Sequence, residues 1–251
     1  MIARFSMKAL LKNIFCSVCR VIVPNQMAEI QQYRHLTAEA KKFRSAGCQE
    51  LSHEERFTRV QKTPFATSQI ESEFVCVMEK VRQLRPETVV EIGAYHGGTL
   101  ALLTQVAPKD CRFLSLDIAY RLSSQMAFKK LAIRNQKITC IAGDSSNSKT
   151  VDIAKKWLGE DKIDLLFIDG DHSLQGVTSD FTLYSPLVRA GGLIIFHDIV
   201  QDCTSRFGTP TNSYTGGVPE FWADLKSQGY QTQEFIADPN QDGYGIGLIV
   251  K

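Results

Sequence analysis

Residues 89–100 read Val89-Val90-Glu91-Ile92-Gly93-Ala94-Tyr95-His96-Gly97-Gly98-Thr99-Leu100, and this stretch decides the fold. It begins as an apolar strand that closes with an acid, passes through a glycine-rich turn and enters a helix. Glycines have no Cβ atom, so they let the backbone approach a ligand closely. The helix adds free N–H groups and the positive end of its dipole. The stretch therefore indicates a nucleotide-like cofactor in an α/β protein; an ordinary strand-to-helix turn is the alternative.

The spacing of the glycines narrows the choice of cofactor. A dinucleotide-binding turn reads G-x-G-x-x-G, whereas here Gly93 is followed by Gly97 and Gly98. Glu91, two residues before the first glycine, would repel a pyrophosphate but attract an ammonium group. A Rossmann-type nucleotide enzyme is therefore disfavoured, and a cofactor with an amino-acid ammonium is favoured.

Four later apolar runs repeat the pattern of a strand that closes with acids. They are RFLSLD at 112–117, ITCIAGDS at 138–145, IDLLFIDGDH at 163–172 and GGLIIFHD at 191–198. Near-continuous apolar strands with polar residues at their carboxyl ends are typical of a buried parallel sheet with a site along that edge. Asp117 follows the turn by about twenty residues, where α/β nucleotide folds place a carboxylate against ribose hydroxyls.

Helices are expected before this sheet. One covers 27–46, and Ser68-x-x-Glu71 is a capping-box signature for another that ends before Pro86. We therefore expect two parts, a helical extension or cap at 1–66 and the cofactor-binding domain at 67–251.

The C-terminal third adds a loop, a helix and two strands. The 201–217 segment is rich in Thr, Ser, Gly, Asn and Pro, and is placed like a substrate loop or lid, although a plain surface loop is the alternative. A helix restarts at Val218 with proline in its first turn. Strands at 230–236 and 245–250 are expected to form an antiparallel pair.

Composition excludes several classes of protein. The 251 residues carry a formal charge of +2 and no basic block of the kind that binds nucleic acid. Seven cysteines, scattered and odd in number, do not form a disulfide framework, and Cys76, Cys111 and Cys140 are expected to be reduced core residues. Cys16-x-x-Cys19 lacks a second Cys/His pair for zinc. The chain is expected to work in a reducing compartment, the cytoplasm.

The N-terminal residues 1–23 combine apolar side chains with a basic stripe. Arg4, Lys8 and Lys12 recur every four residues, and no acid appears before Glu29. The run is too short to span a membrane and lacks a signal-peptide cleavage site. Three interpretations stay open: a helix packed on the domain or on a second subunit, an interfacial helix on an anionic membrane, or a transit peptide.

The motifs together resemble class I S-adenosylmethionine-dependent methyltransferases. The turn E-I-G-x-x-x-G-G-T, Asp117, Gly143-Asp144 and the runs F-I-D-G-D-H and G-G-L-I-I-F-H-D carry this likeness, which covers residues 68 to 251. The chain is most similar to bacterial small-molecule and sugar O-methyltransferases, some of which use a divalent metal. The resemblance implies a Rossmann-like, seven-stranded, mostly parallel sheet with helices on both faces and an antiparallel C-terminal hairpin.

The resemblance also implies a set of cofactor-binding residues. The methionine part of S-adenosylmethionine would lie against the turn, with Glu91 facing the ammonium directly or through water; Asp117 would accept from the ribose hydroxyls and Asp144 from the adenine amino group. Helix or turn capping is the alternative for Glu91 and Asp117. The full expected set is Glu91, Gly93, Ala94, Tyr95, Gly97, Gly98, Thr99, Asp117, Gly143, Asp144, Ser145 and Asp169.

Catalytic candidates follow the fourth and fifth strands. Asp169, Asp171, His172, His197 and Asp198 would converge beside the methyl group. Asp169 and Asp198, with His197, could hold Mg²⁺ or another divalent ion that lowers the pKa of a substrate hydroxyl. Alternatively, His172 or His197 acts as a general base without metal, with Asp169 beside it. The plain structural alternative is that His172 caps a helix and His197 supports the sheet end.

These observations predict an S-adenosylmethionine-dependent methyltransferase acting on a hydroxyl of a small molecule or sugar. A catalytically inactive cofactor-binding fold, serving as a subunit or membrane-associated scaffold, is the alternative that the basic N-terminus favours. No nucleic-acid partner is expected, since a basic block of the kind that binds nucleic acid and an N-P-P-Y-like motif are both missing. Self-association is open, and the acceptor cannot be deduced from these residues.

Overall fold

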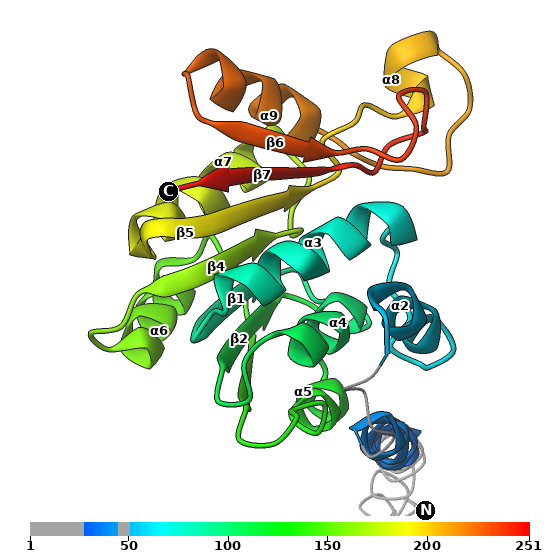
Figure 1. Ribbon diagram of the computed structural model, residues 1–251, viewed down its shortest axis with the longest axis vertical. Coiled ribbons are helices and arrows are strands. Elements are labelled where there is room, and N and C mark those ends of the chain that lie inside the picture. The colour runs from blue at the N-terminus through cyan, green and yellow to red at the C-terminus, as the bar shows by residue number, and fades with distance from the viewer. Residues whose placement is uncertain (1–27, 45–50) are drawn as a thin grey trace, which may run out of the picture.

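A computed structural model describes residues 28–44 and 51–251. Its centre is a seven-stranded sheet in the order β3-β2-β1-β4-β5-β7-β6 (Figure 1). Strands β1 to β5 pair in parallel, whereas β7 runs antiparallel to both β5 and β6. The predicted sheet and its antiparallel C-terminal pair are confirmed. The strands are β1 (Thr88–Ile92), β2 (Arg112–Asp117), β3 (Lys137–Ala142), β4 (Ile163–Ile168), β5 (Val188–His197), β6 (Thr232–Phe235) and β7 (Ile246–Val250).

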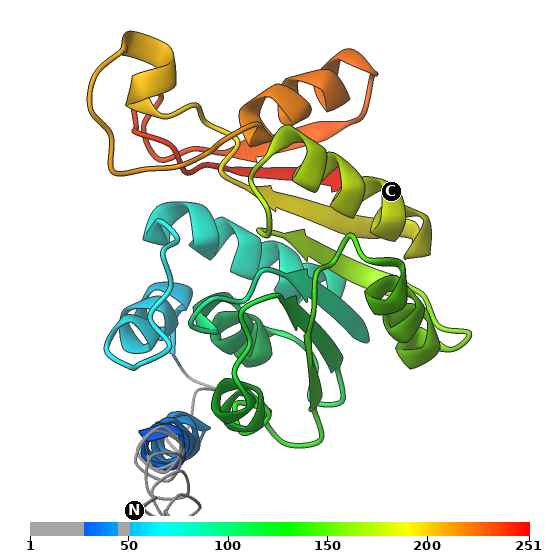
Figure 2. The same ribbon diagram turned by 180° about the vertical axis from the view of Figure 1, so that it is seen from behind.

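Helices cover both faces of this sheet (Figures 1 and 2). In addition to a helix at 28–44, they are α2 (His53–Gln61), α3 (Glu71–Leu84), α4 (Gly98–Val106), α5 (Leu122–Phe128), α6 (Ser148–Leu158), α7 (Leu174–Tyr184), α8 (Cys203–Phe207) and α9 (Val218–Ser227). The helix at 28–44, α2, α3 and α4 pack on one face, and α6, α7 and α9 on the other. The predicted layers are confirmed.

Alternation along each strand produces the two apolar layers. In β1, Val89 packs under α3 and α4, while Val90 and Ile92 pack under α6 and α7. Successive side chains of a strand point to opposite faces of a sheet, so a strand buried on both faces must be apolar throughout. This explains the continuous apolar runs in the sequence and leaves the polar groups at the strand ends.

The predicted capping box at Ser68 is wrong. Helix α3 begins at Glu71, its N-cap is Ile70, and no side chain caps it. Ile70 has an extended backbone, with φ −81° and ψ 131°, and the side chain of the preceding Gln69 donates to Asp169, with 3.1 Å between Nε2 and Oδ2. A reciprocal capping box instead begins α2, where Ser52 and Glu55 each accept from the other's backbone N–H.

Other local predictions have mixed outcomes. Cys111 and Cys140 are buried as expected, but Cys76 is exposed on α3. The expected helix at 27–46 is present over 28–44, and Pro219 lies in the first turn of α9. Cys16, Cys19 and the basic stripe of residues 1–23 lie outside the described residues. Within the described part of the chain, no helix is both long enough and apolar enough to cross a membrane.

Candidate active site

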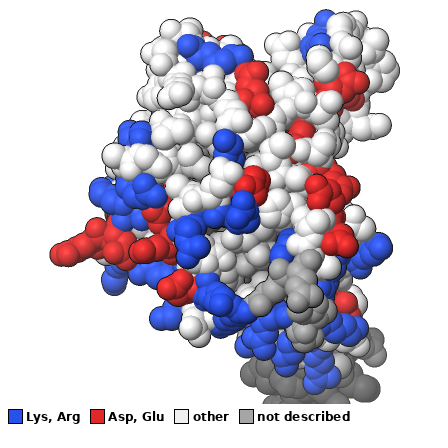
Figure 3. Space-filling view, in the orientation of Figure 1, with Lys and Arg blue, Asp and Glu red and all other residues white. Residues whose placement is uncertain are grey.

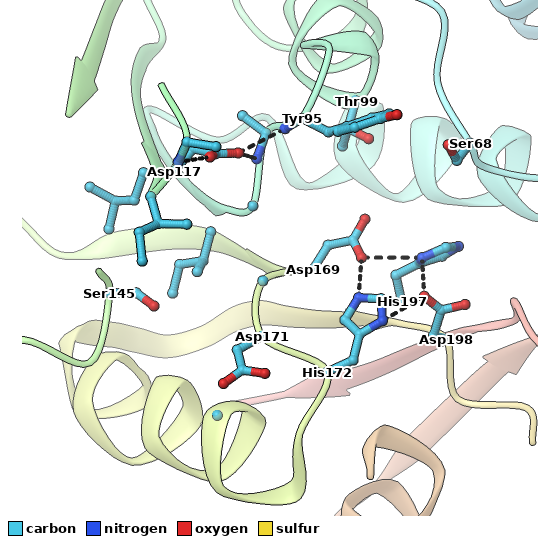
Figure 4. A pocket seen from close by; sticks show the side chains of 18 of the residues that line it. Ser68, Tyr95, Thr99, Asp117, Ser145, Asp169, Asp171, His172, His197 and Asp198 are labelled. Atoms are coloured by element: carbon cyan, nitrogen blue, oxygen red, sulfur yellow. Dashed lines mark hydrogen bonds and ion pairs between the residues drawn. The ribbon is translucent and has the colours of Figure 1, made fainter. Parts of the chain in front are cut away.

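A cavity of about 1230 Å³ lies at the carboxyl edge of the parallel strands. The turns after β1 to β5 form most of its wall, together with residues 66–69, part of the 201–217 segment and Tyr244. Figure 4 shows Tyr95 and Asp117 on one side and Asp169, His172, His197 and Asp198 on the other. The carboxyl ends of parallel strands meet at one edge of a sheet, so residues far apart in the chain come together here.

Two glycines allow the turn after β1 to pack closely. Gly93 has φ +84°, and a Cβ at that position would lie 1.8 Å from the backbone oxygen of Asp169. Gly97 has φ +82°, and its Cβ would meet the ring of Phe128 at 2.7 Å. Gly97 was expected to face the ligand, but it does not line the cavity; packing against Phe128 requires it. Gly93, Ala94, Tyr95, Gly98 and Thr99 do line the cavity.

Asp117 holds the glycine turn in place. Its Oδ2 accepts from the backbone N–H groups of Ala94 and Tyr95 at 2.9 Å each, and its Oδ1 accepts from that of Ala119 at 2.7 Å. Tyr95 has φ +45°, an uncommon value for a residue with a Cβ atom. Asp117 therefore performs the turn capping considered from the sequence, and it also lines the cavity.

Glu91 does not face the cavity, which corrects the expectation that it meets the ligand ammonium. Its side chain is fully buried, and its carboxyl accepts a hydrogen bond from Ser115, whose hydroxyl also bonds to Tyr120. Burial raises the pKa of Glu91 to about 8, and the Ser115 hydrogen bond opposes that rise. Glu91 is therefore part of the packing beneath the turn.

Acidic side chains also line the cavity around the turn after β3. Gly143, Asp144 and Ser145 line the cavity, and Asp144 accepts from the N–H of Ser146 at 2.8 Å. Asp180 on α7 lines it too, although sequence reasoning missed it. Burial raises its pKa to about 6, partly opposed by the hydroxyl of Ser145. Its spacing in the sequence could have indicated its burial, because Asp180 lies three residues after Val177 and four before Tyr184 on the buried face of α7.

Asp169, His172, His197 and Asp198 form one connected group, here named the acid–imidazole cluster. Asp169 Oδ1 lies 3.3 Å from His172 Nε2 and 3.2 Å from His197 Nδ1. Asp198 Oδ2 lies 3.1 Å from His197 Nδ1 and 3.6 Å from His172 Nδ1. His172 Nδ1 is also 2.7 Å from the backbone oxygen of Tyr214.

The cluster stabilises charged forms despite its burial. Burial favours neutral imidazoles, yet the charges and hydrogen bonds of the neighbouring carboxylates raise the pKa of His172 to about 9 and of His197 to about 10. Burial raises the pKa of Asp169, but the two imidazoles outweigh it and bring that pKa to about 2. The carboxylate of Asp169 is therefore stabilised by the two imidazolium groups of His172 and His197.

The same cluster offers a donor set for a divalent cation. Asp169, His172 and Asp198 each present one ligand atom, and these atoms lie within 4.8 Å of one another. His197 was expected in this set, but its side chain is only 4% exposed, whereas that of His172 is 21% exposed. His172 is thus the better placed third ligand. Two carboxylate oxygens and one imidazole suit a cation of intermediate hardness.

Several residues of the wall could not have been assigned from sequence. Gln69 donates to Asp169, Tyr244 donates its backbone N–H to Asp198 at 3.0 Å, and Gln32 reaches the wall from the helix at 28–44. Asn212, Ser213 and Tyr214 line the cavity from the 201–217 segment, which sequence reasoning had placed as a substrate loop. The short helix α8 also belongs to this segment.

The cavity carries more acidic than basic groups, even with the imidazolium groups of His172 and His197 counted, whereas the outer surface is mixed. Among the described residues that line it, the only Lys or Arg is Arg121, against the aspartates 117, 144, 169, 171, 180 and 198. Figure 3 shows both charges spread over one face of the molecule, with Lys and Arg densest near its lower end. Such a cavity favours a cationic ligand and disfavours phosphate groups.

Comparisons with known proteins agree with this geometry. A family model described as "Methyltransferase domain" matches residues 90–199. Uncharacterized protein R132 of Acanthamoeba polyphaga mimivirus is 33% identical over 118 residues, which are 44% of this chain and 51% of that protein. Uncharacterized protein y4gI of Sinorhizobium fredii is 24% identical over 66% of this chain and 17% of its own length. The chain thus spans about half of the first of these relatives and less of the second.

Solved structures share the fold at low identity. The O-methyltransferase from Bacillus cereus, in complex with SAH, has a TM-score of 0.57 at 17% identity and covers 87% of this chain and 100% of its own. TomG from Streptomyces achromogenes, an O-methyltransferase involved in tomaymycin synthesis, has a TM-score of 0.55 at 16% identity, covering 88% and 99%.

A third solved structure is described as containing magnesium. MycE, a methyltransferase of the mycinamycin biosynthetic pathway in complex with Mg and SAH, has a TM-score of 0.53 at 20% identity, covering 82% of this chain and 55% of its own. Residues 90–199 therefore match a methyltransferase domain, and the chain, with its sheet order 3-2-1-4-5-7-6, shares its fold with these methyltransferases.

Proposed function

We propose that the protein transfers the methyl group of S-adenosylmethionine to a hydroxyl of an uncharged small molecule or sugar. The observation that carries this proposal is the acidic cavity beside the glycine turn, which suits a sulfonium cofactor with an ammonium group. The turn after β1 would receive the methionine part, Asp117 the ribose, and the 143–145 turn with Asp180 the adenine. The structural neighbours that are O-methyltransferases support the oxygen acceptor.

The acid–imidazole cluster is the proposed catalytic centre. S-adenosylmethionine supplies an electrophilic methyl: the hydroxyl oxygen forms the new C–O bond, the C–S electrons return to sulfur, and the hydroxyl proton passes to a base. His172 lines the cavity and is the candidate base in its deprotonated form, which it reaches as the pH approaches its raised pKa of about 9; Asp169 and Tyr214 orient its ring. His197 is more deeply buried and would support Asp169.

A divalent ion is compatible with the same residues. Asp169, His172 and Asp198 would hold it, and it would supply Lewis acidity that lowers the pKa of an acceptor hydroxyl. His172 cannot accept the proton and ligate a metal through the same nitrogen. Metal dependence therefore decides between the two roles of this side chain.

The wall beside the cluster supports an uncharged polar acceptor. Thr67, Ser68, Gln69, Asn212 and Ser213 offer hydroxyl and amide groups to the cavity, and such groups can pair with hydroxyls in both directions. Tyr214 adds an exposed ring. Gln32 supports the prediction that the residues before 67 help to cover the cavity.

Calorimetric titration with S-adenosylmethionine and S-adenosylhomocysteine tests the proposal. Both should bind with dissociation constants on the order of micromolar, and Asp117→Ala should reduce the affinity at least about a hundredfold, since it removes the ribose acceptor and the support of the turn. Asp152→Ala, at an exposed acid on α6, is the matched control. No heat with either ligand in the folded wild-type protein would refute the proposal.

A further inference from the structure

Glu73 on α3 is a buried acid that lies outside the cavity. Its side chain is 1% exposed, and its carboxylate accepts three hydrogen bonds. Oε1 accepts from the Ala237 N–H at 3.0 Å and from Gln241 Nε2 at 2.8 Å, and Oε2 accepts from the Gly245 N–H at 3.1 Å. All three donors belong to residues 236–245, here named the β6–β7 connection. One buried carboxyl group therefore bonds to both ends of a connection without regular structure.

The β6–β7 connection reaches the cavity through Tyr244. The backbone N–H of Tyr244 donates to Asp198 Oδ1 at 3.0 Å, and its ring lies edge-on to His197 at 5.9 Å between centroids. Gly243, Tyr244 and Gly245 have φ values of +76°, +60° and +81°. Three successive residues in the left-handed region need tertiary contacts to hold them, above all at a tyrosine.

The same connection also holds the 201–217 segment. Asp242 accepts from the Cys203 N–H at 2.7 Å and from Thr211 Oγ1 at 2.6 Å. Gly243 packs so closely on this segment that a Cβ there would lie 1.9 Å from Ser213 Oγ. Hydrogen bonds and close packing therefore link the 201–217 segment to the β6–β7 connection, and Glu73 links both of them to α3.

We propose that Glu73 is a positioning residue that acts through Tyr244 on Asp198. It positions the acceptor half of the site, which is the acid–imidazole cluster together with the 201–217 segment. Its carboxylate keeps the β6–β7 connection in the conformation that directs the Tyr244 N–H at Asp198 and the Tyr244 ring at His197. Glu73 touches neither the cavity nor the glycine turn, so it leaves the cofactor half unchanged. The proposal rests on the proposed function only in naming the Asp198 side as the acceptor half.

Glu73→Gln tests this role with almost no change in volume. A glutamine offers one oxygen where the carboxylate offers two, so its amide NH₂ must face either the Gly245 N–H or the Ala237 and Gln241 donors. At least one bond is lost and a donor faces a donor, while the apolar packing of α3 is kept. Glu71→Gln, an exposed acid in the first turn of the same helix, is the matched control.

Nuclear magnetic resonance of the full chain gives the readout. In Glu73→Gln, amide exchange at Tyr244 and Gly245 should accelerate about tenfold or more, while exchange at Val90 in the central strand β1 stays unchanged. The imidazole signals of His197 should shift, because the adjacent Tyr244 ring moves. The affinity for S-adenosylhomocysteine should stay within twofold. Glu71→Gln should change none of these quantities.

Three outcomes would overturn the proposal. They are unchanged Tyr244 and His197 signals in folded Glu73→Gln, an equal acceleration of exchange at Val90, and a loss of S-adenosylhomocysteine affinity as large as the change at Tyr244. If the variant does not fold, Gln241→Ala removes one partner of Glu73 and should produce the same changes at smaller size. Failure of the wild-type protein to bind the cofactor would refute the methyltransferase function while leaving the exchange result to decide the role of Glu73.

Discussion

The buried carboxyl of Glu91 makes a testable contribution to the pH dependence of stability. Its pKa is raised from 4.5 to about 8 in the folded protein, first because it is buried and then because of the charges of Asp169 and Asp117, while Ser115 opposes the rise. In the unfolded chain the group ionises near its ordinary value. A group whose pKa is raised on folding contributes stability below the unfolded pKa and loses it as pH rises toward the folded pKa. The window of loss is therefore about pH 4.5 to 8.

Glu91→Gln should remove this loss. The glutamine oxygen can still accept from Ser115, and its amide does not ionise. Each pH unit in the window is worth about 1.4 kcal/mol. Between pH 5 and 8.5 the free energy of unfolding of the variant, relative to that of the wild type, should therefore rise by on the order of 4 kcal/mol.

Urea unfolding of both proteins at pH 5, 6, 7 and 8.5 measures this difference. The histidines of the acid–imidazole cluster titrate in both proteins, so their contributions cancel when the two curves are subtracted. Glu71→Gln, whose site is exposed, should give a flat difference. A flat difference for Glu91→Gln would mean that Glu91 is ionised in the folded state, and the reasoning from its burial would be refuted.

Three further predictions address the turn and the cluster. Gly93→Ala should cost more than about 3 kcal/mol of stability in urea unfolding, because its Cβ would overlap the Asp169 oxygen, whereas Gly208→Ala, in the left-handed region with φ +67° and open space around it, should cost about 1 kcal/mol. His172→Ala should bind S-adenosylhomocysteine within twofold of wild type in calorimetry but lose at least about a hundredfold in turnover with hydroxylated acceptors. Asp198→Asn should weaken Mn²⁺ binding, followed by electron paramagnetic resonance, about tenfold or more; equal affinities would rule out Asp198 as a ligand.

The sheet could be predicted because the burial of each strand determines the pattern of residues within that strand. A strand buried on both faces must be apolar throughout, and the turns at its carboxyl end are where polar side chains can gather. That reasoning located β2 at its observed bounds and brought Asp169 and Asp198 to one edge, although they are 29 positions apart in the chain.

The error at Glu91 has a physical reason that the sequence also contained. Glu91 is the fourth of five residues in β1, so it lies inside the strand rather than at its end. Side chains alternate along a strand, and Val90 and Ile92 belong to the layer under α6 and α7. Glu91 must therefore point into the opposite layer, toward Ser115, and not along the edge where a ligand would lie.

Residues that depend on tertiary contacts could not be predicted. Gln69, Tyr244 and Glu73 act through partners that lie 100, 46 and as many as 172 positions away in the chain. No local pattern distinguishes such residues from ordinary polar positions. The Ser68 capping signature failed because α3 begins only at Glu71, with Ile70 as its N-cap, and the side chain of the intervening Gln69 donates instead to the distant Asp169.

Asp169 contacts the glycine turn through its backbone and the rest of the acid–imidazole cluster through its carboxylate. Its backbone oxygen abuts Gly93 so closely that only a glycine fits, and its N–H donates to Ile92 at 2.8 Å. Its carboxylate bonds to both histidines of the cluster and to Gln69. The turn proposed to carry the cofactor and the group proposed to receive the acceptor proton are therefore held in fixed register by one residue at the end of β4. Because reacting groups must be aligned closely for methyl transfer, a change at Gly93 should disturb the acceptor half through Asp169.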